Sequence, residues 1–254
     1  MAAGSRKPKG AKGGVKKAIV VILTGIFLFF AYVLSGYAVC ANIPFVTESV
    51  ALATVNESGS PFDSQQLSQA ALAVREYSFG ANDQEALYDV VSEINDAAGT
   101  PYAGADVGRL MNAPDEYTIT ADQIDHLDDV YGIARSLVLP IFGVVVITIF
   151  LIMVGYRMFG LGAVASSLKI SGIAAIAAIG VIALFAVISF QGFFSYFHAV
   201  FFDDGTWTFP ADSLLIQSLP ESFWATMAVI WGATTLLLGI LSFVMGSLFN
   251  RRLR

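Results

Sequence analysis

The chain holds only two histidines, His126 and His198, and each has carboxylates near it in the sequence. Asp129 follows His126 by three positions, a spacing that places two side chains on one face of a helix. Asp203 and Asp204 come shortly after His198. An imidazole is the side chain best suited to move protons near neutral pH, and a neighbouring carboxylate can choose its tautomer. These residue types favour proton-transfer chemistry by a histidine pair.

Other roles are open to the same residues. His126, His198 and one of the two later aspartates could ligate a metal ion, although no tight His-x-x-x-His spacing is present. Ser195, three residues before His198, could act as a nucleophile. Each histidine could also be a hydrogen-bonding residue without any chemistry. We expect neither a metal nor a cofactor.

Four uncharged apolar runs must position these residues. Only 13% of the residues are charged and the mean hydropathy is +0.69, whereas soluble chains are about one quarter charged. A helix needs roughly 20 residues to cross a bilayer. The runs that are long enough are 18–37, 137–156, 170–190 and 223–249. The sequence therefore predicts an all-α integral membrane protein with four transmembrane helices.

The segments between these runs differ sharply in charge. Eleven of the 14 basic residues lie in 1–17, 157–169 and 250–254, and no acidic residue lies there. All 20 acidic residues lie in 41–136 and 191–222. Because Lys and Arg mark the cytoplasmic side of a membrane protein, both ends are predicted to be cytoplasmic tails. The two acidic segments, each with one histidine, are predicted to be extracytoplasmic.

The segment 41–136 is expected to form a small, acidic helical domain between the first two spans. Apolar periodicity predicts helices near 63–79 and 83–97, with Asp83 as an N-cap. The domain has no disulfide available, since the chain has one cysteine, and must fold by packing alone.

A third helix is predicted to carry His126 toward the second span. Thr120 and Gln123 have the spacing of a capping box at its start. Pro140 is expected to interrupt it near the membrane surface, because proline lacks the N–H that a helix uses.

The segment 191–222 is longer and more aromatic than a simple connector, and we expect an interfacial loop there. Ser218 and Glu221 predict a second capping box, at the start of the fourth span. Spans two and three are joined by a short segment, so they should run antiparallel with neighbouring outer ends. His126 and His198 are therefore expected to meet at one site.

Two motifs resemble those of the Lit family, the bacterial lipoprotein intramolecular transacylases. One is His126-Leu127-Asp128-Asp129-Val130, which is similar to the family's His-Leu-x-Asp-Val. The other is a longer set: Phe197-His198-Ala199-Val200-Phe201-Phe202, Trp207, Asp212, Leu215-Ile216 and Leu219-Pro220-Glu221. The resemblance covers nearly the whole chain after the basic tail, and the segment 41–120 departs from the family.

The resemblance implies an acyltransferase. Members of this family move an ester-linked acyl chain of a diacylglyceryl-modified lipoprotein onto the amino group of its N-terminal cysteine, which gives a lyso-form lipoprotein. By resemblance His126 is the general base and His198 supports it as an acid or oxyanion stabiliser, an order that can be reversed. Supporting roles fall to Asp129, Asp203, Asp204 and Trp207.

The resemblance also implies a multi-pass protein of the bacterial cytoplasmic membrane with an extracytoplasmic active site. Its partners would be the lipoprotein substrate and membrane lipids, and not nucleic acid. The alternatives are a non-catalytic membrane scaffold or sensor and a metal-dependent membrane hydrolase. A transporter is disfavoured because the four runs contain no ionisable side chain of the kind that moves ions.

Overall fold

A computed structural model describes residues 9–253 of the chain, with side chains from residue 13 onward. This part of the chain contains eleven helices and no strand. Residues 1–8 of the predicted basic tail, and Arg254, lie outside it. Four helices are long and apolar enough to cross a membrane: Gly13–Asn42, Ala121–Phe159, Leu161–Ile188 and Glu221–Arg252. The prediction of an all-helical membrane protein with four spans is confirmed.

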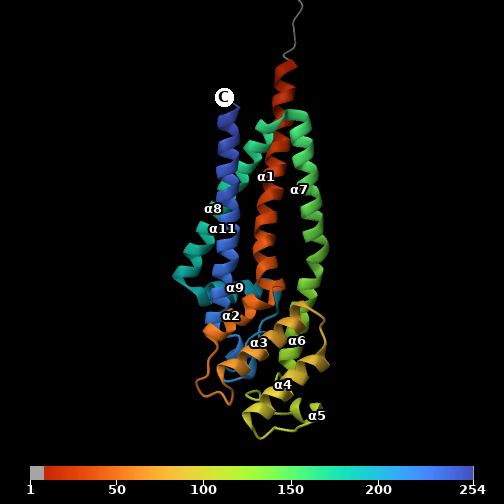
Figure 1. The fold of residues 1–254 in the computed structure, drawn as a ribbon, viewed down its shortest axis with the longest axis vertical. Coiled ribbons are helices and arrows are strands. Elements are labelled where there is room, and N and C mark those ends of the chain that lie inside the picture. Colours follow the sequence, from red (N-terminus) through yellow and green to blue (C-terminus); the bar gives the residue numbers. More distant parts are fainter. Residues whose placement is uncertain (1–8, 254) are drawn as a thin grey trace, which may run out of the picture. The chain divides into compact units, whose positions relative to one another are not determined.

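The described chain divides into two compact units. One consists of residues 9–35, 139–181 and 232–253, and the other of residues 36–138 and 182–231. The first unit is built from parts of the long helices α1 (Lys9–Asn42), α7 (Val138–Phe159), α8 (Leu161–Ile188) and α11 (Glu221–Arg252), which are labelled in Figure 1. Both histidines belong to the second unit.

Small residues bring α8 and α11 into close contact in the first unit. A Cβ added to Gly172 would lie 2.5 Å from the backbone oxygen of Gly239, so only glycine fits there. A polar contact adds α1 to this pair, since the Tyr32 hydroxyl donates to the Ser242 hydroxyl over 2.6 Å. Membrane helices gain from such packing because lipid provides no hydrophobic drive for their association.

Two helices of the second unit begin close to where the sequence predicts. α3 (Ser64–Phe79) follows Asp63, whose carboxylate accepts the Gln66 backbone N–H over 2.8 Å. α4 (Gln84–Ala98) follows Asp83, which accepts from two backbone N–H groups, and ends at Gly99 in the left-handed conformation. The predictions for 63–79 and 83–97 are confirmed, because capping is local chemistry that a short sequence specifies.

The helix that carries His126 also begins as predicted. In α6 (Ala121–Ser136) the Gln123 side-chain oxygen accepts the Thr120 backbone N–H over 3.1 Å, as in a capping box. α6 ends at Ser136 and α7 begins at Val138. Pro140 explains the interruption, because it has no N–H to bond the Ser136 carbonyl. Within the candidate span Ala121–Phe159, α6 carries four aspartates, so the apolar stretch of that span lies in α7.

The segment 191–222 is not the loop that we expected, because it holds two helices. α9 (Phe190–Phe201) has no buried residue, whereas α10 (Leu214–Ser218) inserts into the core of the second unit. The backbone N–H of Leu214 donates to the Asp115 carbonyl over 2.7 Å. The capping box predicted at Ser218 is wrong: the Ser218 hydroxyl donates to the Leu215 carbonyl, because Ser218 ends α10 and does not precede α11.

The remaining helices of the second unit are α2 (Pro44–Thr54) and the short α5 (Val107–Leu110), which the apolar periodicity did not reveal. The core of the unit forms where α3 packs against α2, α4, α6 and α10. Its fully buried side chains include Leu67, Val91, Leu110, Ile119 and Leu214.

Candidate active site

His126 is held by the core of the second unit. It lies on α6 between Ile124 and Leu127, which are both buried in the core, and its own side chain is only 9% exposed. A polar tie fixes the same helix to α3, since the Tyr77 hydroxyl donates to an Asp128 carboxylate oxygen over 2.7 Å. The position of this imidazole is therefore set by tertiary packing on two adjacent turns of α6.

The Tyr77 hydroxyl can donate this hydrogen bond to Asp128 throughout the physiological pH range. Burial first, and then the hydrogen bond and charge of Asp128, raise the pKa of the Tyr77 hydroxyl above its ordinary value. The phenol therefore stays protonated and remains a donor. Asn82 donates a second hydrogen bond to the same Asp128 oxygen over 3.1 Å. Asp128 is thus an anchoring residue of the His126 motif, which the sequence did not reveal.

His198 is held by its own helix. α9 is capped by Ser189, whose hydroxyl accepts the Gly192 backbone N–H over 3.0 Å, and His198 lies in the last turn of the helix. The Nδ1 atom of His198 lies 2.8 Å from the carbonyl oxygen of Phe194, one turn earlier. A carbonyl can only accept, so Nδ1 carries the proton, and in the neutral ring Nε2 keeps a free lone pair.

The two imidazoles are neighbours, as their predicted placement required. Their ring centroids lie 6.2 Å apart and their planes differ by 28°. Aromatic rings surround the pair. The ring centroids of Phe202 and Phe209 lie 4.7 and 5.7 Å from that of His126, and those of Phe194 and Trp207 lie 4.0 and 4.8 Å from that of His198. The site is a histidine pair inside a largely apolar enclosure.

This enclosure keeps both rings neutral at physiological pH. Burial, together with the nearby charge of His198, lowers the pKa of His126 to about 4, while Asp129 acts in the opposite direction. Burial also lowers the pKa of His198, and there the hydrogen bond to the Phe194 carbonyl opposes the shift. Protonation of one ring disfavours protonation of the other, so the pair is suited to hold one proton at a time.

In the described part of the chain, none of the three predicted carboxylates forms a hydrogen bond or ion pair with either imidazole. Asp129 is exposed and acts on His126 through its charge, with no hydrogen bond to the ring in the described structure. Asp203 and Asp204 are exposed as well. Together with Gly205 they form a turn, in which the Asp203 backbone carbonyl accepts the Thr206 N–H over 3.3 Å.

A metal site is not assembled from these residues. Within residues 9–253, no three or more His, Cys, Asp or Glu side chains gather as the ligands of a metal ion would. The metal-ligand set considered from the sequence is therefore not formed by His126, His198 and either Asp203 or Asp204.

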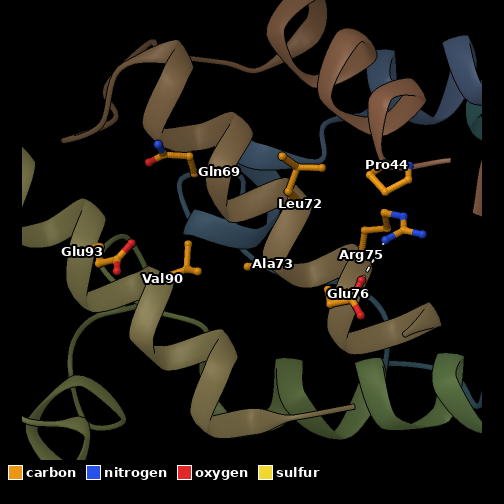
Figure 2. A pocket seen from close by; sticks show the side chains of 8 residues that line it. All are labelled: Pro44, Gln69, Leu72, Ala73, Arg75, Glu76, Val90 and Glu93. Carbon is orange, nitrogen blue, oxygen red and sulfur yellow. Dashed lines mark hydrogen bonds and ion pairs between the residues drawn. The ribbon is translucent and has the colours of Figure 1, made fainter. Parts of the chain in front are cut away.

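A groove of about 390 Å³ opens elsewhere on the second unit, among α2, α3 and α4 (Figure 2). It contains Arg75, Glu76 and Glu93, but neither histidine. Arg75 is already engaged there, since it pairs with Glu76 over 2.9 Å and donates to the Ala41 carbonyl over 2.9 Å. The groove offers no proton-transfer group comparable with the histidine pair.

Sequence reasoning missed two groups that define the site. The Phe194 carbonyl orients His198, and the spacing of four residues within one helix was the available signal. Phe209 contacts His126 from a segment without regular structure, and no local pattern indicates that contact.

Comparison with known proteins identifies the family. A family model described as lipoprotein intramolecular transacylase Lit matches residues 20–224. The chain belongs to this family. It is therefore an acyltransferase of the membrane, and the Lit family acts on lipoproteins.

Solved structures agree on the fold. The in meso structure of the membrane integral lipoprotein intramolecular transacylase Lit from Bacillus cereus superposes with a TM-score of 0.65 at 14% identity, covering 94% of this chain and 98% of that one. A structure of the same Bacillus cereus protein with a histidine-to-arginine mutation gives a TM-score of 0.60 at 14% identity and 94% coverage of both chains. No curated protein matches the chain in sequence.

Proposed function

We propose that this Lit protein transfers an ester-linked acyl chain of a diacylglyceryl-modified lipoprotein to the α-amino group of the lipid-bearing cysteine. The observation that carries the proposal is the pair of neutral imidazoles 6.2 Å apart inside an aromatic enclosure. An apolar, water-poor site protects an ester from hydrolysis and strengthens the electrostatic contacts made inside it. A transfer between two groups of one substrate also gains from being held in the reacting geometry.

His198 is the better general base of the two. Its Nδ1–H is committed to the Phe194 carbonyl, so the free Nε2 lone pair is ready to accept a proton. The same hydrogen bond opposes the lowering of its pKa, whereas the pKa of His126 falls to about 4. A base works best with a pKa near the operating pH, so these contacts favour the reverse of the order expected from the family resemblance.

His126 is suited to donate a hydrogen bond as a neutral imidazole. Its Nδ1 is buried and has no hydrogen-bond partner in the described structure. An orphaned buried N–H is rarer than an orphaned acceptor, so the neutral ring places its proton on Nε2. With its lowered pKa the ring stays neutral, and Nε2–H can stabilise the negative oxygen that forms on the ester.

The proposed reaction then has two steps. The amine nitrogen attacks the ester carbonyl carbon, forming a C–N bond and pushing an electron pair onto the carbonyl oxygen. His198 Nε2 takes the proton that the amine loses. The tetrahedral intermediate then collapses, the C–O bond to the glyceryl group breaks, and the leaving oxygen receives the proton from His198. The products are an amide and a free glyceryl hydroxyl, and the enzyme returns to its starting state.

The charge pattern supports the placement of this site on the extracytoplasmic side of the bacterial cytoplasmic membrane, with both chain ends inside. Eleven basic residues flank the predicted inner ends of the spans, and both histidine-bearing segments hold all the acids. The second unit would then be the extracytoplasmic domain. Reporter fusions at Gly104 and Arg254 test this topology, and a cytoplasmic signal at Gly104 would contradict it.

Mass spectrometry of a reporter lipoprotein tests the activity itself. The protein is co-expressed in a host that lacks this transfer, and the N-terminal peptide of the reporter is analysed. We expect one acyl chain on the amine and one on the glyceryl group with the wild-type protein, and an unmodified amine with His198→Ala at matched expression. An unmodified amine with the wild-type protein would contradict the proposal. Loss of transfer in EDTA with rescue by zinc would support a metal-dependent hydrolase instead.

A further inference from the structure

Trp207 has a buried hydrogen-bond donor that is unpaired in the part of the chain that the structure describes. Its indole Nε1 is buried and has no hydrogen-bond partner among the described residues. An indole N–H can only donate, and tryptophans usually pair this group when they bury it. Because leaving a buried donor unpaired destabilises a protein, the unpaired N–H of Trp207 calls for an explanation.

The chain holds this indole beside the proposed base. The indole lies 4.8 Å from the His198 ring, between centroids, and the two planes differ by 31°. The turn at Asp203 and Gly205 carries the chain from the end of α9 back to His198. Gly205 has a φ of +87°, a conformation that favours glycine. Exposed Asp203 and Asp204 thus serve the site as turn residues.

We infer that the Trp207 Nε1–H is a second donor to the acyl ester, beside His126, and binds its carbonyl oxygen as negative charge develops there. The inference rests on the proposed acyl transfer and names a further catalytic residue for it. An ester brings an acceptor oxygen into an enclosure whose other walls, Phe194, Phe202 and Phe209, are apolar rings. Two donors that converge on one oxygen are the usual way to stabilise such an intermediate.

The sharpest test removes the N–H and keeps the ring. Trp207 is replaced by benzothienylalanine, in which sulfur takes the place of the indole N–H, and Trp224 receives the same analogue as a matched control. We expect kcat of the 207 variant to fall about 100- to 1,000-fold, the effect of losing one oxyanion donor, with little change in KM. The 224 variant should keep the wild-type rate.

The pH profile separates donation from an effect on His198. The indole does not titrate, so the acid limb of the 207 variant should coincide with that of the wild-type enzyme. If the acid limb of the pH–rate profile moves to another pH as kcat falls, the indole ring acts through the pKa of His198. This result would overturn the inference. Equal rates for the 207 and 224 variants would overturn it as well.

A measurement on the wild-type protein does not depend on how the variant folds. The indole nitrogens are labelled with ¹⁵N, and an N-acetylated diacylglyceryl-cysteine peptide, whose blocked amine cannot attack, is added. We expect the Trp207 N–H proton signal to move downfield on saturation and the Trp224 signal to stay. No movement of the Trp207 signal would contradict the inference. A wild-type enzyme that transfers no acyl group would instead contradict the proposed function, which separates the two failures.

Discussion

α6 and α9 each carry one histidine of the pair, and the two helices are held in opposite ways. α6 buries Gln123, Ile124, His126 and Leu127 and is tied to α3 through Tyr77 and Asp128. α9 buries no residue, and its ordered features are local: a capping serine and a hydrogen bond from His198 to its own helix. The imidazole of His126, which is held fixed, is suited to donate a hydrogen bond to an oxyanion. The imidazole of His198, which is more accessible, is suited to gain and lose a proton.

The largest expected difference between the two helices lies in how each histidine tolerates glutamine. A glutamine amide can donate a hydrogen bond but cannot act as a base near pH 7. His198→Gln should therefore lose about 100- to 10,000-fold in kcat, the usual contribution of a general base. His126→Gln should retain more activity than His126→Ala, because the amide still donates. Single-turnover rates on purified protein measure this, and equal losses for both glutamine variants would contradict the assignment.

The pH dependence of the rate tests the environment of α9. The pKa of His198 is lowered by burial, so the base is neutral at pH 7 and is lost only below its ordinary value of about 6.5. The pKa of the substrate amine is about 8. A plot of log kcat/KM against pH should therefore bend once near the amine pKa and again below about 6.5. The second bend should be absent in His198→Gln, and a second bend above 6.5 in the wild-type enzyme would contradict the burial of this ring.

The tie between α6 and α3 should matter mainly for stability. Tyr77→Phe removes the donor to Asp128 and leaves that carboxylate with Asn82 alone. A hydrogen bond to a charged group contributes about 1.5–3 kcal/mol. We expect the thermal unfolding midpoint in detergent to fall by several degrees, with a smaller loss of kcat through the position of His126. An unchanged midpoint would show that packing alone holds α6.

The cap of α9 should have the smallest effect. Ser189→Ala removes the acceptor for the Gly192 N–H, and losing an N-cap costs about 1 kcal/mol of helix stability. Because α9 buries nothing in the core, the unfolding midpoint should stay within error of the wild-type value. Hydrogen exchange of the α9 amides should become faster. A fall in the midpoint as large as that of Tyr77→Phe would show that α9 is part of the cooperative core.

The sequence predicts a helix well where local contacts fix it, and poorly where distant contacts do. The start of α6 was predictable because Thr120 and Gln123 form a local capping pattern. The two helices inside 191–222 were not, because their aromatic and apolar residues give the same signal in an interfacial loop. α10 is fixed by distant partners such as Asp115, which no short window of sequence contains.

The candidate site, too, could be predicted only where its contacts are local or follow from the order of the spans. The meeting of His126 and His198 could be predicted from their places beside two antiparallel spans. The carbonyl of Phe194 was within reach of sequence reasoning, because it lies one helical turn before His198. The contact of Phe209 could not be foreseen, since it depends on how an irregular segment folds back. Trp207 was expected near the site only through the family resemblance, and no local pattern indicates its contact with His198. Asp128, and not Asp129, proved to be the residue of the motif that is hydrogen-bonded to α3.

The double substitution of both histidines tests most directly whether the pair acts as one unit. Transfer rates are measured for His126→Ala, His198→Ala and the double variant under single-turnover conditions, with EDTA present throughout. Residues that act together are non-additive, so the double variant should be little slower than His198→Ala. A double variant whose loss equals the product of the two single losses would show that the imidazoles act independently, and would contradict the shared site.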